Sequence, residues 1–174
     1  MSHADALHEK AIAAYNSGDF ELAETHIRSA IDIDNQNPHA HINLANILMA
    51  RGRYSAALLS LSTATGIASD ISIAHYLKGV ALEEMGNPNA ALESTNVALA
   101  LDPQSVKALL LRGNLFISLG NTPAAIADYQ TAMALDDANA LTHFNLACAL
   151  SNQGRLNEAL VEYDAALAIF PELV

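Results

Sequence analysis

Residues 106–139 read VKALLLRGNLFISLGNTPAAIADYQTAMALDDAN, and the spacing of their small residues recurs along the whole chain. Glycines fall 34 residues apart at Gly18, Gly52, Gly86, Gly120 and Gly154. Two series of alanines follow the same period: Ala23, Ala57, Ala91, Ala125 and Ala159, and Ala30, Ala64, Ala98, Ala132 and Ala166. A fixed period of this length indicates one supersecondary unit copied in tandem. The five copies are residues 4–37, 38–71, 72–105, 106–139 and 140–173.

Each copy is predicted to contain two helices joined by a short turn. Leu109, Gly113 and Phe116 follow helical spacing, so they lie on one face of a first helix. Gly120 ends that helix, because the residue past a helix C-terminus commonly adopts a left-handed conformation that glycine reaches cheaply. Asn121 then caps a second helix that carries proline in its first turn, where a missing N–H costs nothing. The chain is therefore predicted to be an all-α solenoid of ten helices.

The two alanine series have a packing reason. Antiparallel helices approach closely only where the side chains at their crossing are small. We expect a third series, which is aliphatic, to fill the space behind the alanines: Ile33, Ile67, Leu101, Leu135 and Ile169.

Composition and charge exclude several classes of function. The net charge of −11 argues against binding a nucleic-acid backbone, which needs a basic surface. No apolar stretch approaches the ~18 residues of a membrane helix, so no membrane insertion is expected. Cys148 is the only cysteine, which favours a reducing compartment and hence the cytoplasm. The acidic side chains concentrate in the first copy, where they serve solubility or, as an alternative, attract an electropositive partner.

No catalytic, cofactor or metal site is predicted. The histidines at 41, 75 and 143 share one position of the repeat and lie too far apart to hold one ion. Cys148 has no base within one helical turn, and Glu83 and Glu84 diverge by about 100° around a helix. We interpret all of them as packing or solvated residues.

The 34-residue period, Gly or Ala at the eighth position of each copy, and the recurrent glycine and alanines together resemble the tetratricopeptide repeat family. The resemblance covers residues 4–173, which implies a single domain. It also implies a right-handed superhelix whose concave groove, lined by the first helix of each copy, binds a peptide or a partner protein. Pentatricopeptide repeats, which read RNA, have a longer period.

The family pattern implies which side chains face that groove. The candidates for binding a partner are Asn43, Asn46, Tyr76, Lys107, Leu110, Asn114, Phe144 and Asn145. In the first copy the pattern also turns six residues toward the groove: Asp5, His8, Glu9, Ile12, Tyr15 and Asn16. The chaperone-binding subtype is rejected, because its carboxylate clamp needs a lysine and an asparagine where His8 and Ile12 stand.

A second subtype fits part of the chain. Asn43 and Asn145 occupy the position whose asparagines hold a peptide backbone in the superhelix of O-GlcNAc transferase. An asparagine amide offers an extended chain both a donor and an acceptor. Glu9, Leu77 and Leu111 interrupt the series in the intervening copies.

The sequence therefore predicts a non-enzymatic scaffold that binds a protein or peptide in its groove. One alternative is the N-terminal targeting arm of a larger, glycosyltransferase-like enzyme whose catalytic domain lies beyond residue 174. A third hypothesis is self-assembly, because the last helix keeps the apolar pattern of internal copies where a solenoid normally ends in a polar cap. We expect a fragment of a longer protein, and a homodimer formed through this uncapped C-terminal repeat.

Overall fold

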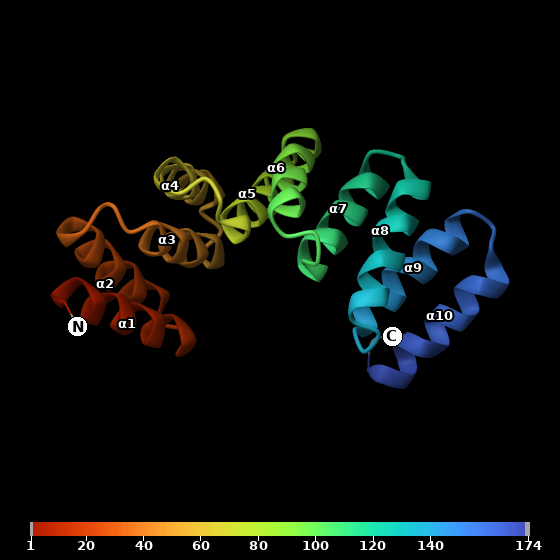
Figure 1. Ribbon diagram of the computed structural model, residues 1–174. Helices are drawn as coiled ribbons and strands as arrows, with labels where there is room; N and C mark the ends of the chain where they lie inside the picture. The colour runs from red at the N-terminus through yellow and green to blue at the C-terminus, as the bar shows by residue number, and fades with distance from the viewer. Residues whose placement is uncertain (1, 173–174) are drawn as a thin grey trace. The chain divides into compact units, whose positions relative to one another are not determined.

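The computed structural model describes residues 2–172, which form ten helices and no strand (Figure 1). The first five are α1 (His3–Asn16), α2 (Phe20–Ile33), α3 (Pro38–Ala50), α4 (Tyr54–Ile67) and α5 (Ser72–Glu84). The remaining five are α6 (Pro88–Leu101), α7 (Val106–Ser118), α8 (Thr122–Leu135), α9 (Ala140–Asn152) and α10 (Leu156–Ile169). The prediction of an all-α chain with two helices per copy is confirmed.

The helix ends follow from the residues predicted to make them. All five repeat glycines have positive φ, between 70° and 81°, and each lies in the turn between the two helices of its copy. Asn121 accepts a hydrogen bond from the backbone N–H of Ala124 and so caps α8, and Asp19 does the same for α2 through Leu22. These caps satisfy donors that the first turn of a helix otherwise leaves unpaired.

The two alanine series are buried, as close packing of the helices requires. Every member of the two series is at most 2% exposed. The expectation for the aliphatic series was wrong, because four of its members are 40–54% exposed: Ile33, Leu101, Leu135 and Ile169. Each is the last residue of its helix, so it lies past the crossing where the chain already turns away.

The chain divides into two compact units, Met1–Asn87 and Pro88–Val174. In the first, α1 to α5 pack each on the next, and in the second α6 to α10 do the same. The boundary falls inside the third copy of the repeat, between α5 and α6. The single domain over residues 4–173 stays a prediction.

The second unit contains one contact that depends on glycine. Gly113 of α7 faces the ring of Tyr129 of α8, and a Cβ at this glycine would overlap the ring. Tyr129 is only 2% exposed. Glycine at this position therefore allows an aromatic ring to fill the crossing of α7 and α8.

Candidate functional site

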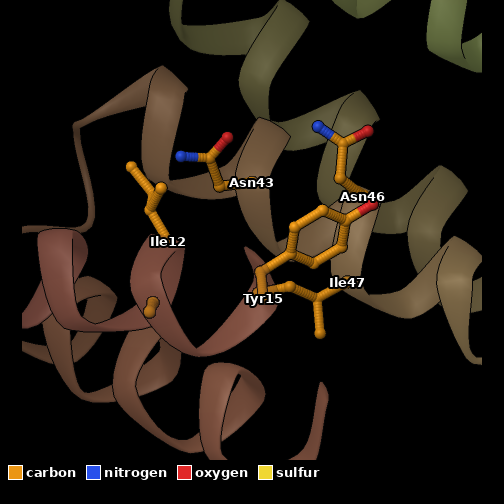
Figure 2. A pocket seen from close by; sticks show the side chains of 6 residues that line it. Ile12, Tyr15, Asn43, Asn46 and Ile47 are labelled. Carbon is orange, nitrogen blue, oxygen red and sulfur yellow. The ribbon is translucent and has the colours of Figure 1, made fainter. Parts of the chain in front are cut away.

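An apolar cavity of about 160 Å³ lies between the first helices of the first two copies (Figure 2). We call it the α1–α3 cavity, and it is lined by Ala11, Ile12, Tyr15, Asn43, Asn46 and Ile47. The Tyr15 ring packs on Phe20 with 5.4 Å between ring centroids, which fixes one wall. Both predicted asparagines of α3 thus lie at one site, beside apolar side chains.

The two asparagines differ in how they are held. The amide nitrogen of Asn43 donates to Nε2 of His8 on α1, so this ring nitrogen carries no proton. Burial, followed by the charge of His39, lowers the pKa of His8 and also favours the neutral ring. Among residues 2–172, the amide of Asn46 has no hydrogen-bond partner in the protein, so both its donor and its acceptor remain available to a ligand.

A second, more polar cavity adjoins the first along α1. We call it the acidic cavity, and it is lined by Asp5, His8, Glu9 and Ile12. Ile12 lines both cavities, and the hydrogen bond between His8 and Asn43 joins their walls. Asp5 accepts a 2.7 Å hydrogen bond from the backbone N–H of Ser2, and bonds from Ser2 lower the pKa of this carboxyl. The surface of α1 is therefore apolar at one end and anionic at the other.

In the second unit, the predicted residues Asn114 and Asn145 lie together. The amide nitrogen of Asn145 donates to Oδ1 of Asn114 at 3.3 Å, and the Tyr129 hydroxyl donates to the same oxygen at 2.7 Å. These residues and Cys148 are part of the lining of a cavity of about 270 Å³, which we call the α7–α9 cavity. Tyr129 was not a predicted site residue, because it belongs to a second helix and the family pattern selects only first helices.

The other predicted groove residues lie outside these cavities. Tyr76 is half-buried among the apolar side chains of the first unit, and burial together with Glu83 raises its pKa. Leu110 is only 8% exposed and serves packing, whereas Lys107 is exposed. Phe144 is half-buried, and its ring packs against that of Tyr163 in a T-shaped arrangement. The structure therefore brings together the asparagines rather than the apolar candidates.

The histidines of the repeat share one structural role. Nε2 of His41, His75 and His143 each lies 3.0 Å from a backbone carbonyl oxygen six residues earlier, in the turn that joins two copies. The ring N–H donates to this oxygen and ties the turn to the following helix. Among residues 2–172, no three His, Cys, Asp or Glu side chains are placed to hold a metal ion.

His143 has a second partner. Its Nδ1 lies 2.6 Å from Oε2 of Glu162, so both ring nitrogens face an acceptor, an arrangement that favours the imidazolium form. Burial alone would lower the pKa of His143, but the hydrogen bonds to Glu162 and to the Asp137 carbonyl, with the charge of Glu162, raise it overall.

This raised pKa makes the stability of the last copy depend on pH. The stabilisation is complete below the unfolded pKa of about 6.5 and is lost as the pH rises through the higher folded value. We expect His143→Ala to cost about 1.5–3 kcal/mol at about pH 5.5 and clearly less at about pH 9, by urea unfolding. In a Glu162→Gln background this pH dependence should shrink, because only the hydrogen bond to the Asp137 carbonyl and the charge of Asp137 still raise the pKa of His143. An undiminished dependence would contradict the assignment.

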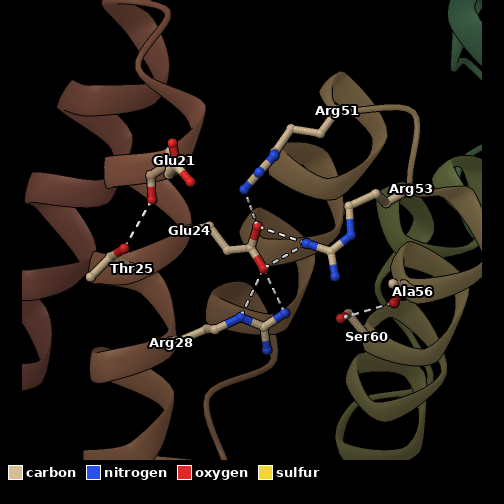
Figure 3. A network of polar contacts seen from close by, with 8 residues as sticks. All are labelled: Glu21, Glu24, Thr25, Arg28, Arg51, Arg53, Ala56 and Ser60. Atoms are coloured by element: carbon tan, nitrogen blue, oxygen red, sulfur yellow. Dashed lines mark hydrogen bonds and ion pairs between the residues drawn. The ribbon is translucent and has the colours of Figure 1, made fainter.

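A polar cluster that lies outside the cavities described above joins the first two copies (Figure 3). Glu24 of α2 is 7% exposed, and its carboxylate accepts hydrogen bonds from Arg28, Arg51 and Arg53 at 2.5–3.0 Å. Burial alone would raise the pKa of Glu24, but the hydrogen bonds and charges of Arg28 and Arg53 lower it overall.

This cluster was missed by reasoning from the sequence, although a signal exists. At the position of Glu24 the other copies carry only aliphatic residues, namely Leu58, Leu92, Ile126 and Leu160. A charged residue in an otherwise aliphatic series indicates a buried ion pair with the next copy. The cluster lies on α2 and on the turn between α3 and α4, so it links the first copy to the second, and the α1–α3 cavity lies between the first helices of these same two copies.

Comparison with known protein families identifies the repeat. Models described as tetratricopeptide repeat match residues 8–82 and 140–173, and a model described as TPR repeat matches residues 113–154. The chain belongs to the tetratricopeptide repeat (TPR) family. TPR proteins bind protein or peptide partners, so this TPR chain is a protein–protein interaction scaffold. No curated protein matches its sequence.

Solved structures share the fold over nearly the whole chain. TTC0263, a thermophilic TPR protein of Thermus thermophilus, is 25% identical with a TM-score of 0.77, over 98% of this chain and 93% of that one. MamA from Desulfovibrio magneticus RS-1 is 17% identical with a TM-score of 0.86, over 98% of this chain and 96% of MamA. YrrB, described as a TPR protein with an unusual peptide-binding site, is 18% identical with a TM-score of 0.76, over 96% and 86%.

Proposed function

We propose that this chain binds an extended segment of a partner protein through the first helices of its repeats, at the α1–α3 cavity. The observation that supports this is the amide of Asn46, unpaired among residues 2–172, beside an apolar cavity. An extended segment can insert a side chain into the cavity while Asn46 binds its backbone. Asn43 joins this contact when the ligand replaces His8 as its partner. The α7–α9 cavity, with Asn114 and Asn145, provides a second place for such a segment.

Photo-crosslinking tests the position of the partner. A benzoylphenylalanine at Tyr15, which lines the α1–α3 cavity, should capture a partner from native extract. The matched control carries it at Leu59 of α4, which is 73% exposed and lines none of the cavities described above. We expect the Tyr15 adduct to be lost in an Asn43→Ala/Asn46→Ala background. The same adduct from both sites, or from the alanine variant at full yield, would overturn the proposal.

A second candidate function, self-association through α10, is favoured by a specific exposure. Leu160 of α10 is 60% exposed, whereas Ile126, its equivalent in α8, is 5% exposed. α8 packs against both α7 and α9, whereas within residues 2–172 α10 packs against α9 alone, so the face equivalent to that of Ile126 is uncovered there. Leu156, Val161 and Phe170 are also exposed. A second copy of this chain placed on α10 would cover this apolar face.

Light scattering over a range of concentrations tests this association. We expect wild type to move from monomer to dimer as concentration rises, because burying the leucines of α10 releases apolar surface from water. Leu160→Glu places a charge in the interface and should remain monomeric at every concentration. The matched control is Leu59→Glu, on an exposed leucine of α4. Wild type that stays monomeric throughout would contradict the assignment.

The chain acts by binding rather than by catalysis in this proposal. Cys148 accepts a 3.3 Å hydrogen bond from the Tyr163 hydroxyl, and no His, Lys, Asp or Glu is among the described residues that line the α7–α9 cavity with it. The net charge of −11 and the single cysteine support a protein partner rather than nucleic acid, and a cytoplasmic location. None of the helices within residues 2–172 has the length and apolarity that a membrane span requires.

A further inference from the structure

We propose that the segment bound at the α1–α3 cavity carries a single apolar anchor residue with a lysine or arginine two residues away. This inference rests on the proposed function and adds the chemistry of the partner. The anchor enters the α1–α3 cavity, and the cation meets the carboxylates of the acidic cavity.

The size and lining of the α1–α3 cavity determine which side chain of the partner segment can serve as the anchor. Its volume is about 160 Å³, and its walls are mostly apolar. An apolar cavity of roughly 150 Å³ holds a benzene molecule. One leucine, isoleucine or phenylalanine side chain therefore fills it, and a polar side chain would lose hydrogen bonds to water there.

The charge beside the α1–α3 cavity determines the charge of the residue two positions from the anchor. Asp5 and Glu9 line the acidic cavity, and no lysine or arginine of the described chain lines either cavity. The arginines of this unit contact Glu24 instead. A cationic side chain complements this end of α1, and an anionic one is repelled.

The spacing follows from the geometry of helix and strand. A helix rises about 1.5 Å per residue, so Glu9 lies about 7 Å along α1 from the middle of the wall formed by Ile12 and Tyr15. An extended peptide rises about 3.3 Å per residue, and every second side chain faces the same side. Residues i and i+2 of a peptide that runs along α1 are thus about 7 Å apart on one face. Leucine at i and lysine at i+2 or i−2 reach the two cavities together.

The test uses a symmetric probe, acetyl-Gly-Lys-Ser-Leu-Ser-Lys-Gly-amide, titrated into the full chain and followed by amide chemical shifts. Two control probes differ from it: in one, glutamate replaces both lysines, and in the other, serine replaces the leucine. We expect the lysine probe to bind at least about fivefold more tightly than either control probe. Its preference over the glutamate probe should disappear in about 0.5 M NaCl. Shifts should centre on Ile12, Asn43 and Asn46.

Charge reversal on the protein completes the test. Glu9→Lys should abolish the preference for the lysine probe, because Asp5 then only balances the new lysine in the acidic cavity. Glu93→Lys, an equal change on an exposed residue of α6, should keep the wild-type preference. Equal binding of the lysine and glutamate probes to the wild-type chain would overturn this inference and leave the proposed function standing. If no leucine probe shifted any residue of the α1–α3 cavity, both would fail.

Discussion

Gly113→Ala is expected to destabilise the second unit by about 2 kcal/mol, despite the better helix propensity of alanine. That propensity favours alanine by about 1 kcal/mol in an exposed helix. Here the new Cβ would overlap the buried ring of Tyr129, and overpacking of this kind costs about 1–3 kcal/mol or more. Displacing the ring also breaks its 2.7 Å hydrogen bond to Asn114. Urea unfolding followed by circular dichroism measures the loss.

A double variant identifies Tyr129 as the cause. The second copy has Ala45 and Leu61 at the two equivalent positions, both fully buried. Gly113→Ala/Tyr129→Leu installs that pair in the fourth copy, so it should be more stable than Gly113→Ala alone. The double-mutant cycle should give a coupling above about 1 kcal/mol. Additive effects of the two substitutions would show that the ring is not the obstacle.

Glu24→Ala is expected to destabilise the first unit by about 3 kcal/mol at about pH 7. Removing one partner of a buried ion pair costs about 3–5 kcal/mol. The low end applies, because the three arginine side chains are 31–50% exposed and reach water once the carboxylate is gone. As a control, Glu158→Ala breaks the exposed pair with Arg155 and should leave the unfolding curve unchanged.

The lowered pKa of Glu24 predicts how this loss varies with pH. The stabilisation is present above the ordinary glutamate pKa of about 4.3 and is lost as the pH falls through the lower folded value. The difference between wild type and Glu24→Ala should therefore shrink toward about pH 3. Glu24→Leu/Arg51→Leu restores the aliphatic residue of the other copies and should recover most of the loss. A double variant as unstable as Glu24→Ala would contradict this account.

The fold followed from the sequence because its signals are local and repeated five times. A glycine at positive φ, a capping side chain and a buried alanine each depend on a few neighbouring residues. The aliphatic series that ends with Ile169 was misjudged, since periodicity locates a residue on a helix face but not relative to the end of a crossing.

The candidate site could be predicted only in part. The family pattern indicated Asn43 and Asn46, and the structure places both at one cavity. The family pattern could not indicate the hydrogen bond between His8 and Asn43, because these residues lie 35 apart in the chain. The Tyr129 contact with Asn114 was equally hidden, because it depends on the side chain that fills one helix crossing.

The most direct measurement is an amide chemical-shift map of the labelled chain with the partner segment recovered by crosslinking at Tyr15. The account predicts that the largest shifts fall on α1 and α3, at the residues that line the α1–α3 cavity and the acidic cavity. They should be lost in Asn43→Ala/Asn46→Ala, whose circular dichroism spectrum should match wild type. Shifts confined to the second helices α2 and α4 would contradict the central claim that the first helices bind the partner.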